Sequence, residues 1–368
     1  MEYRKLPHGT EELSTIGLGM GNIAVAADEE IEKTISYAID HGINFFDMVC
    51  GRTGVYEAFA RVTKGRRDKI YIQMHFGAVY PKGVYEFSRD LDEIKRSFEK
   101  VLKAAGTDYT DFGYIHCIDE QQDFDNVMAK GGLFDYVRSM KEQGVVKHIG
   151  FSSHTPGIAR QFLATGEIDL FMFSINPAYD YSKGGEYAKG GVTDRTALYQ
   201  EAQRRGVGIS VMKAFAGGQL LDEKRSPLNM ALSRNQCIQY ALDRPAVLTV
   251  LPGVGSAKDV EDVLEFYNIS PEERDYSTLG SATPSEAIDR CVYCNHCAPC
   301  PQGIDVGLVN KYYDLAKVGD ELAKSHYEKL SVKADACVQC GHCESRCPFH
   351  VKQPEHMKEI QKYFREGE

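Results

Sequence analysis

The stretch Cys337-Val338-Gln339-Cys340-Gly341-His342-Cys343-Glu344-Ser345-Arg346-Cys347-Pro348 decides the fold of the C-terminal part of the chain. Its spacing, C-x2-C-x2-C-x3-C-P, lets one short loop bring three thiolates onto three irons of a cubane cluster. The fourth cysteine, which precedes a proline, points away and ligates a second cluster. The stretch therefore predicts an iron–sulfur domain.

A second run of cysteines lies upstream, with a spacing that is shorter by one residue. It reads C-x2-C-x2-C-x2-C-P and ends at Cys300-Pro301. Crossed ligation of the bacterial ferredoxin type gives one [4Fe–4S] cluster to Cys291, Cys294, Cys297 and Cys347, and the other to Cys337, Cys340, Cys343 and Cys300. Structural zinc sites are the alternative, because C-x2-C is also a zinc spacing. Two four-cysteine runs ending in Cys-Pro favour a mainly helical, ferredoxin-like domain with two [4Fe–4S] clusters over residues 286–368.

The first 276 residues alternate short β-branched and aromatic runs with amphipathic stretches. The eight runs are Thr15–Gly19, Ile43–Asp47, Ile70–Met74, Phe112–His116, His148–Ser152, Leu170–Ile175, Val207–Met212 and Val247–Leu251. The stretches between them include Glu29–His41, Leu91–Ala105, Phe134–Gln143, Thr196–Arg205 and Asn229–Leu242. Eight such alternations predict an α/β protein with a closed (β/α)8 TIM barrel. An open doubly wound sheet is disfavoured because no strand is followed by G-x-G-x-x-G. Residues 277–285 lack periodicity and are predicted to be a linker.

Composition narrows the location and the partners. The chain of 368 residues has a formal net charge of −10, which disfavours a nucleic-acid or membrane partner. No apolar run approaches the ~20 residues that span a bilayer, and the N-terminus lacks the apolar segment of a secretory signal. We therefore expect a cytoplasmic protein whose 11 cysteines are not disulfides.

Polar residues follow the predicted strands. In a parallel barrel the C-terminal ends of all strands meet at one mouth, where the chemistry takes place. The residues at these ends are Asp47, His75, His116, Ser152, Ser153, His154, Asn176, Lys213 and the loop Pro252-Gly253-Val254-Gly255-Ser256. They predict a polar pocket that accepts a small-molecule substrate.

Several segments resemble the aldo/keto reductase family. They include Ile16-Gly17-Leu18-Gly19, Gly42-Ile43-Asn44-Phe45-Phe46-Asp47, Tyr114-Ile115-His116 and Leu251-Pro252-Gly253, and the tail resembles the branch with a C-terminal 4Fe–4S domain. The resemblance implies NAD(P)H-dependent interconversion of carbonyls and alcohols. The cofactor-binding residues that it implies are Ser152, Ser153, Asn176, Lys213, Gly253, Gly255, Ser256 and Lys258. Lys258 would face a 2′-phosphate or, as the alternative, be a solvated surface charge.

The catalytic positions depart from that family. It uses an Asp–Tyr–Lys–His tetrad, and the matching positions here hold Asp47, Arg52, His75 and His116. Arginine is a poor proton donor but clamps carboxylates or phosphates well. We therefore expect Arg52 to anchor an anionic substrate, and His75 or His116 to act as the general acid.

Three functions remain open from the sequence. The first is an NAD(P)-linked carbonyl or alcohol oxidoreductase with auxiliary clusters. The second is a nicotinamide-independent reductase that receives single electrons from ferredoxin, because a cluster passes one electron at a time whereas a nicotinamide delivers two. The third is a non-catalytic electron-transfer protein. A flavin is also compatible with a barrel of this type.

Overall fold

The computed structural model describes residues 1–181, 188–282, 291, 293, 295–317, 319–347 and 349–366. Its main sheet contains eight parallel strands, in the order in which they occur along the chain. They are β3 (Leu18–Gly19), β4 (Phe45–Asp47), β5 (Tyr71–Phe76), β8 (Thr110–Ile115), β9 (Val146–Ser153), β10 (Leu170–Ser174), β11 (Gly208–Met212) and β12 (Val247–Val250). All eight coincide with predicted strands.

The first and last strands join, so the sheet closes on itself. The backbone N–H of Gly17 donates to the carbonyl of Val250 at 2.9 Å, and the N–H of Val250 donates to the carbonyl of Thr15 at 2.9 Å. Ile16 and Val250 form a parallel bridge between these bonds. The predicted closed barrel is therefore confirmed, and its C-terminal strand ends share one mouth.

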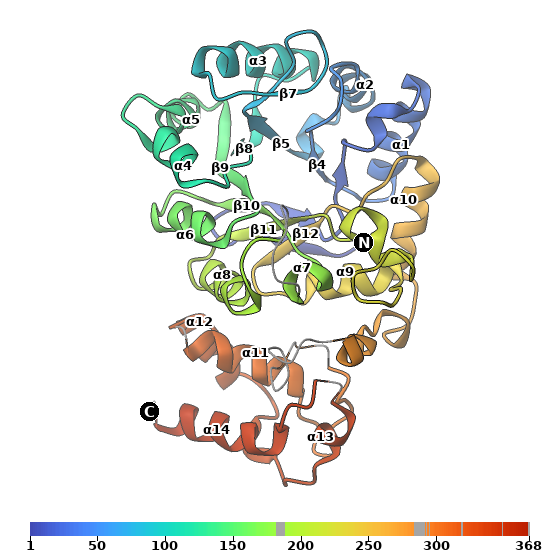
Figure 1. Cartoon of the computed structure of the whole chain (residues 1–368), viewed down its shortest axis with the longest axis vertical. Coiled ribbons are helices and arrows are strands. Elements are labelled where there is room, and N and C mark those ends of the chain that lie inside the picture. Colours follow the sequence, from blue (N-terminus) through green and yellow to red (C-terminus); the bar gives the residue numbers. More distant parts are fainter. Residues whose placement is uncertain are drawn as a thin grey trace.

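Helices surround the barrel (Figure 1). They are α1 (Asp28–Asp40), α2 (Gly54–Thr63), α3 (Leu91–Ala104), α4 (Gln121–Met128), α5 (Leu133–Glu142), α6 (Pro156–Ala164), α7 (Pro177–Tyr181), α8 (Val192–Arg204), α9 (Arg234–Leu242) and α10 (Ala257–Leu264). Helix α1 shows why they pack on the sheet: Ile31, Ile35 and Ala38 are buried and recur at helical spacing. Two short hairpins complete this part, β1 (Tyr3–Lys5) with β2 (Glu12–Ser14) and β6 (Ala78–Val79) with β7 (Glu86–Phe87).

Helix α9 begins later than the sequence predicts. The periodicity suggested a start near Asn229, but that residue has a φ of 54°, in the left-handed region. The helix begins after Ser233, whose side chain accepts a hydrogen bond from the N–H of Gln236, while the Gln236 side chain accepts one from the N–H of Ser233. This reciprocal cap, rather than the apolar period, sets the start of the helix.

The C-terminal segment forms a small helical domain beside the barrel. Its helices are α11 (Val306–Lys317), α12 (Glu321–Glu328), α13 (His342–Arg346) and α14 (Gln353–Glu366). Figure 1 shows them together at the end of the molecule nearest α8 and α9. They enclose a core that includes Val309, Tyr313, Met357 and Ile360. Within the predicted linker, residues 277–282 form a 3-10 helix, and 283–285 lie outside the described residues.

The C-terminal domain and the barrel share packed surfaces. Phe349 and Val351 are buried in the same apolar cluster as the barrel core. The guanidinium of Arg244, just after α9, lies 5.8 Å from the ring centre of Tyr293. Lys311 of α11 lines a pocket with Arg4 and Val247, which lie at the N-terminal end of the barrel. In the described part of the chain, no helix has the length and apolar character needed to cross a bilayer.

Candidate active site

Asp47 and His75 form an ion-pair contact at the mouth. Asp47 ends β4 and His75 lies near the end of the neighbouring strand β5. His75 Nε2 is 3.1 Å from Asp47 Oδ1, and the His75 side chain is only 1% exposed. The carboxylate therefore accepts a hydrogen bond from a buried imidazole, which fixes the orientation of the ring.

The contact continues through a second histidine to a tyrosine. His75 Nδ1 lies 2.9 Å from His116 Nδ1, and His116 Nε2 lies 2.9 Å from the hydroxyl of Tyr85. Tyr85 comes from the turn before β7, and its side chain is half-buried at the mouth. The four groups thus form an unbroken hydrogen-bonded chain, called here the Tyr85 relay: Tyr85, His116, His75 and Asp47.

One assignment of protons satisfies every contact in the relay. If His75 Nε2–H donates to Asp47, then His75 Nδ1 accepts from His116 Nδ1–H, and His116 Nε2 accepts from the Tyr85 hydroxyl. Burial lowers the pKa of His116 well below its ordinary value, and the charges of His75 and Arg89 lower it further. His116 is therefore neutral, as this assignment requires. The amide nitrogen of Gln73 lies 3.3 Å from the same His75 Nε2, and the amide oxygen of Gln73 accepts from the Ser210 hydroxyl at 3.4 Å.

Arg52 lies in a different environment from the predicted one. Its Nε donates to the carbonyl of Ala24 at 3.0 Å, and its Nη2 donates to the carbonyl of Ala26 at 3.1 Å and to Asp28 at 2.8 Å. The guanidinium thus fastens the loop before α2 to the loop before α1. These contacts use two of its three nitrogens, so the structure gives the predicted anion clamp no support.

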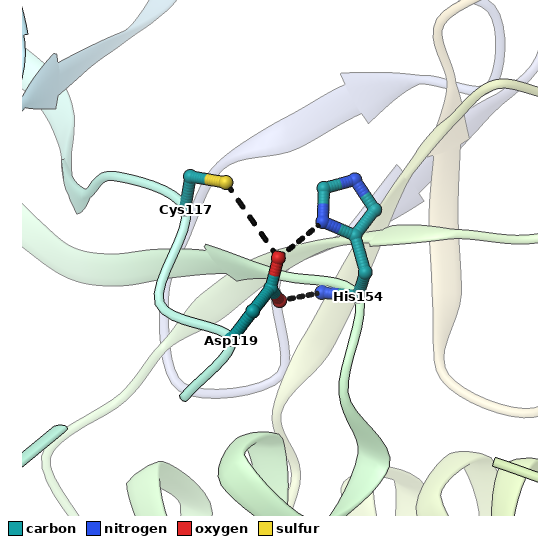
Figure 2. A group of neighbouring side chains, drawn as sticks. All are labelled: Cys117, Asp119 and His154. Carbon is teal, nitrogen blue, oxygen red and sulfur yellow. Dashed lines mark hydrogen bonds and ion pairs between the residues drawn. The ribbon is translucent and has the colours of Figure 1, made fainter. Parts of the chain in front are cut away.

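A second polar group lies at the ends of β8 and β9 (Figure 2). Asp119 Oδ2 lies 2.8 Å from His154 Nδ1 and 3.7 Å from Cys117 Sγ. His154 Nε2 in turn lies 3.1 Å from the Nζ of Lys213, just after β11. Burial alone would raise the pKa of Asp119, but hydrogen bonds and charge from His154 outweigh it and lower the pKa to about 2. Asp119 is therefore ionised.

The two thiols near the mouth are not activated. Burial and the charge of Asp119 raise the pKa of Cys117 to about 11. Burial raises the pKa of Cys50 to about 12, and its sulfur faces the carbonyl of Arg52 at 3.2 Å. Both side chains are therefore protonated thiols near neutral pH, which are weak nucleophiles.

The residues expected to read a nicotinamide are engaged within the protein. Ser152 Oγ accepts from the N–H of Cys117 at 2.8 Å, and Ser153 Oγ donates to Asp119 Oδ1 at 3.1 Å. Asn176 donates to the carbonyl of Lys213 at 2.8 Å and accepts from the N–H of Tyr179 at 2.9 Å. These three side chains are buried, so they hold the loops of the mouth in place.

The loop expected to hold a phosphate already contains carboxylates. Asp259 accepts from the N–H of Gly255 at 3.0 Å and from the Ser256 hydroxyl at 3.1 Å. Glu30, from α1, accepts from the N–H of Ala257 at 3.2 Å. The start of α10 thus has the donors that suit an anion, but the protein's own acidic side chains occupy them.

The remaining phosphate-loop residues add little to such a site. Lys258 pairs with Glu261 and Asp262, at 2.9 Å in both cases, and these bonds raise its pKa. A Cβ on Gly253 would lie 3.0 Å from the Asn22 side chain, so this glycine allows the loop to approach the loop after β3. Two carboxylates beside an engaged lysine disfavour a nucleotide phosphate. In this arrangement the residues present do not fit the dinucleotide that the family resemblance implies.

Some of the predicted cluster ligands lie together as the crossed pairing requires. Cys300, Cys337, Cys340 and Cys343 line one pocket, together with the apolar side chains of Ile304, Val306 and Met357. Four thiols around an apolar pocket suit a [4Fe–4S] cluster. Cys297 is buried in the same domain and Cys347 packs against the barrel core, whereas Cys294 lies outside the described residues. Ligation by the eight cysteines stays a prediction.

A cavity of about 770 Å³ lies at the seam between the barrel and the C-terminal domain. Its lining is strongly charged and includes Asp243, Asp275, His296, Lys311 and Arg346. Its lining residues do not include the Tyr85 relay. We therefore place the chemistry at the barrel mouth rather than in this cavity.

The sequence analysis named His154 among the polar residues at the strand ends but missed two other side chains of the mouth. Tyr85 lies in a short hairpin without a detectable period, and Asp119 lies three residues beyond His116. The proximity of Asp119 to a strand end was the available signal for that residue. No local pattern links Tyr85 to His116, which is 31 residues away along the chain.

Comparisons with known proteins agree with this architecture. The model of the aldo/keto reductase family matches residues 15–236, and that of a 4Fe-4S dicluster domain matches residues 286–351. An uncharacterized oxidoreductase of Bacillus subtilis is 21% identical over 290 residues, which cover 73% of this chain and 92% of that protein.

Solved structures of aldo-keto reductases share the fold. The holo form of an enzyme from Bacillus halodurans aligns with a TM-score of 0.62 at 18% identity, covering 77% of this chain and 97% of that one. An aldo/keto reductase from Klebsiella pneumoniae, solved in complex with NADP and acetate, aligns with a TM-score of 0.54 at 18% identity, covering 75% and 94%.

Proposed function

Because the chain belongs to the aldo/keto reductase family, we propose that it is an oxidoreductase that interconverts a small carbonyl compound and its alcohol at the barrel mouth. The observation that carries this proposal is the Tyr85 relay. It supplies a tyrosine hydroxyl backed by an imidazole, although the family's usual tyrosine position holds Arg52. A hydroxyl, two imidazoles and a carboxylate in series are suited to moving one proton.

The relay works in both directions. When an alcohol is oxidised, Tyr85 accepts the hydroxyl proton of the substrate and passes its own proton to His116 Nε2. The Nδ1 proton of His116 then moves to His75 Nδ1, and Asp47 stabilises the resulting imidazolium at 3.1 Å. Carbonyl reduction follows the reverse path, with Tyr85 delivering the proton to the carbonyl oxygen.

We infer that the electrons come singly through the C-terminal domain. Reduction of one carbonyl to an alcohol consumes two electrons and two protons: the relay delivers the proton of the new hydroxyl group, and solvent supplies the proton of the new C–H bond. Two [4Fe–4S] clusters, held by the eight cysteines in the crossed arrangement, would pass the electrons from a small reduced one-electron donor protein such as a ferredoxin. The carboxylates of Glu30 and Asp259 in the phosphate loop favour this source over NAD(P)H.

The test is a comparison of electron donors. The reconstituted protein is incubated anaerobically with a panel of small aldehydes and 2-oxo acids, with either reduced methyl viologen or NADPH. We expect alcohol formation with the viologen, little with NADPH, and a loss of about 10²–10³-fold in Tyr85→Phe. Tyr3→Phe, in the β1 hairpin, is the matched control. Turnover that needs NADPH would contradict the electron source, and full activity of Tyr85→Phe would contradict the relay.

A non-catalytic electron-transfer protein would give a different result in this comparison of electron donors. A barrel that only transfers electrons would reoxidise its clusters without consuming any carbonyl. It would also leave no reason for a half-buried tyrosine to face two buried histidines and a carboxylate.

A further inference from the structure

Lys213 is held at the barrel mouth in an unusual conformation. Its φ is 59°, a left-handed backbone that residues with a side chain rarely adopt. The buried amide of Asn176 donates to the carbonyl of Lys213 at 2.8 Å and stabilises this conformation. Strained backbone of this kind gathers at functional sites, where surrounding contacts maintain it.

The ammonium of Lys213 is also placed from the other side. Its Nζ lies 3.1 Å from His154 Nε2, and His154 Nδ1 lies 2.8 Å from Asp119 Oδ2 (Figure 2). The other oxygen of Asp119 accepts from the Ser153 hydroxyl at 3.1 Å and from the N–H of His154 at 2.5 Å. Four residues thus hold Lys213 in place: Asn176, His154, Asp119 and Ser153.

The proton positions follow from the donors. An ammonium group only donates, so His154 Nε2 must accept from Lys213, and the ring proton must lie on Nδ1, facing Asp119. This arrangement argues against a metal ion bound by Cys117, Asp119 and His154, whose donor atoms lie within 4.8 Å of one another. A metal would need a lone pair on His154 Nδ1, and Nε2 would then present a proton toward the lysine.

We propose that Lys213 binds the carboxylate of an anionic substrate, so that the substrate class is a small 2-oxo or 2-hydroxy acid. The part of this inference that concerns the reacting carbonyl rests on the proposed function. The binding of an anion by Lys213 does not depend on it. The Lys213 side chain is half-exposed at the strand ends. Arg52, the cation first expected to do this, is engaged with Ala24, Ala26 and Asp28.

The two polar groups of the mouth are joined through the residue that follows His116. This residue is Cys117, and its Sγ lies 3.7 Å from Asp119 Oδ2, so the Tyr85 relay and the Lys213 group are neighbours. Arg89 also links them, because its guanidinium donates to the carbonyls of His116 at 2.9 Å and Cys117 at 2.8 Å. A 2-oxo acid has its carboxylate next to its carbonyl, which suits two neighbouring recognition groups at the barrel mouth.

The experiment measures binding, without turnover. Oxamate, a small carboxylate, and oxamide, its neutral counterpart, are titrated calorimetrically into the full-length, cluster-loaded protein. We expect oxamate to bind at least tenfold more tightly than oxamide. Lys213→Met should remove that preference, while Lys64→Met, which alters an exposed lysine at the end of α2, should keep it. Cluster absorbance and circular dichroism verify that each variant is folded.

A second measurement uses the unaltered protein, so its result does not depend on correct folding of the lysine variant. Oxamate, but not oxamide, should slow acetylation of Lys213 by an amine-reactive ester, followed by mass spectrometry. Equal affinities for oxamate and oxamide, or unchanged oxamate binding in Lys213→Met, would overturn the proposal. So would micromolar Zn²⁺ binding that is lost in Cys117→Ser, because it would place a metal on His154 Nδ1.

The outcome is separable from that of the proposed function. Tyr85→Phe should lose turnover and keep its affinity for oxamate, because Tyr85 is not among the groups that fix Lys213. If no carbonyl is reduced by any donor while oxamate binding depends on Lys213, the proposed function fails and the anion site stands. If carbonyls are reduced with no preference for acids, the proposed function stands and the anion site fails.

Discussion

The Nδ1 atoms of His75 and His116 lie 2.9 Å apart, so a single proton lies between two imidazole rings. One ring must donate and the other must accept. Asp47 on one side and Tyr85 on the other settle which ring does so, since the carboxylate orients His75 and the hydroxyl orients His116. The pair therefore couples the partly buried carboxylate of Asp47 to a hydroxyl group at the mouth.

Interrupting this pair should slow the chemistry. We expect His75→Gln to lower kcat by about 10²-fold, because the proton that reaches His116 then has no neutral imidazole beside Asp47 to receive it. The measurement is turnover with reduced methyl viologen and the best substrate of the panel. His41→Gln, at the end of α1, is the control and should retain full activity. Equal kcat values for the two variants would show that the relay ends at His116.

Removing the carboxylates of the phosphate loop should create affinity for a nucleotide. We expect the unaltered protein to bind NADPH weakly, and the double variant Glu30→Gln, Asp259→Asn to bind it roughly tenfold more tightly, because two negative charges no longer face the phosphate. Nicotinamide fluorescence measures the affinity, and Asp262→Asn is the control. Micromolar NADPH binding by the unaltered protein would contradict the expectation.

Serine variants of single cysteines test the crossed ligation. We expect Cys300→Ser and Cys340→Ser to damage the same cluster and to leave identical spectra from the other one. Cys347→Ser should instead spare the cluster that they damage. Electron paramagnetic resonance of the reduced protein distinguishes these patterns, and Cys50→Ser should leave both clusters intact. Different residual spectra from Cys300→Ser and Cys340→Ser would refute the crossing.

Arg52 should matter for stability and not for anion recognition. We expect Arg52→Gln to lower the Tm by a few degrees, because Ala24, Ala26 and Asp28 lose their shared donor. Oxamate affinity should stay unchanged. A loss of oxamate binding that equals or exceeds that of Lys213→Met would restore Arg52 as the clamp.

The stability of the barrel should depend on pH through His148. Burial lowers its pKa, but contacts with Asp169 at 3.2 Å and Glu11 at 3.0 Å outweigh this and raise it above the ordinary value. A raised pKa means that the stabilisation is complete below the unfolded-state pKa and is lost as the pH rises through the folded-state pKa. The pKa values of Glu11 and Asp169 are lowered, so the cluster weakens again in acid.

His148→Gln should therefore cost roughly 1–3 kcal/mol of unfolding free energy near pH 6 and less near pH 8.5. Urea unfolding of the cluster-loaded protein at the two pH values measures the difference. His41→Gln should show no such dependence. A larger cost at pH 8.5 than at pH 6 would mean that His148 is neutral in the folded protein.

The barrel was predictable because its signals are local and repeated. All eight strands lie where β-branched runs predicted them, and the closing contact of Ile16 with Val250 follows from that pattern. Asp47, His75 and His116 were predictable because strand ends in a parallel barrel share one mouth. Tyr85 was not, since a two-residue strand has no period and its partner lies on another loop.

The remaining differences between the expectations from the sequence and the structure come from contacts between segments that are far apart in the sequence. The motif around Ser256 correctly marks the start of a helix that suits an anion, but Glu30 reaches it from 227 residues away. Arg52 follows Asp47 at the spacing of the family's tyrosine, yet the carbonyls of Ala24 and Ala26 determine its direction. Spacing along a sequence gives the place of a side chain, and only the packed structure gives its partner.

Phe349 and Val351 follow the last cysteines and are buried in the barrel core. The cluster predicted at Cys347 would fix the loop that carries these two side chains, so destruction of that cluster by air would withdraw them and expose apolar surface on the barrel. Oxidative damage would then shorten the lifetime of the whole polypeptide, and proteases would remove the inactive form. Loss of the redox centre would thereby lead to selective degradation of the damaged enzyme.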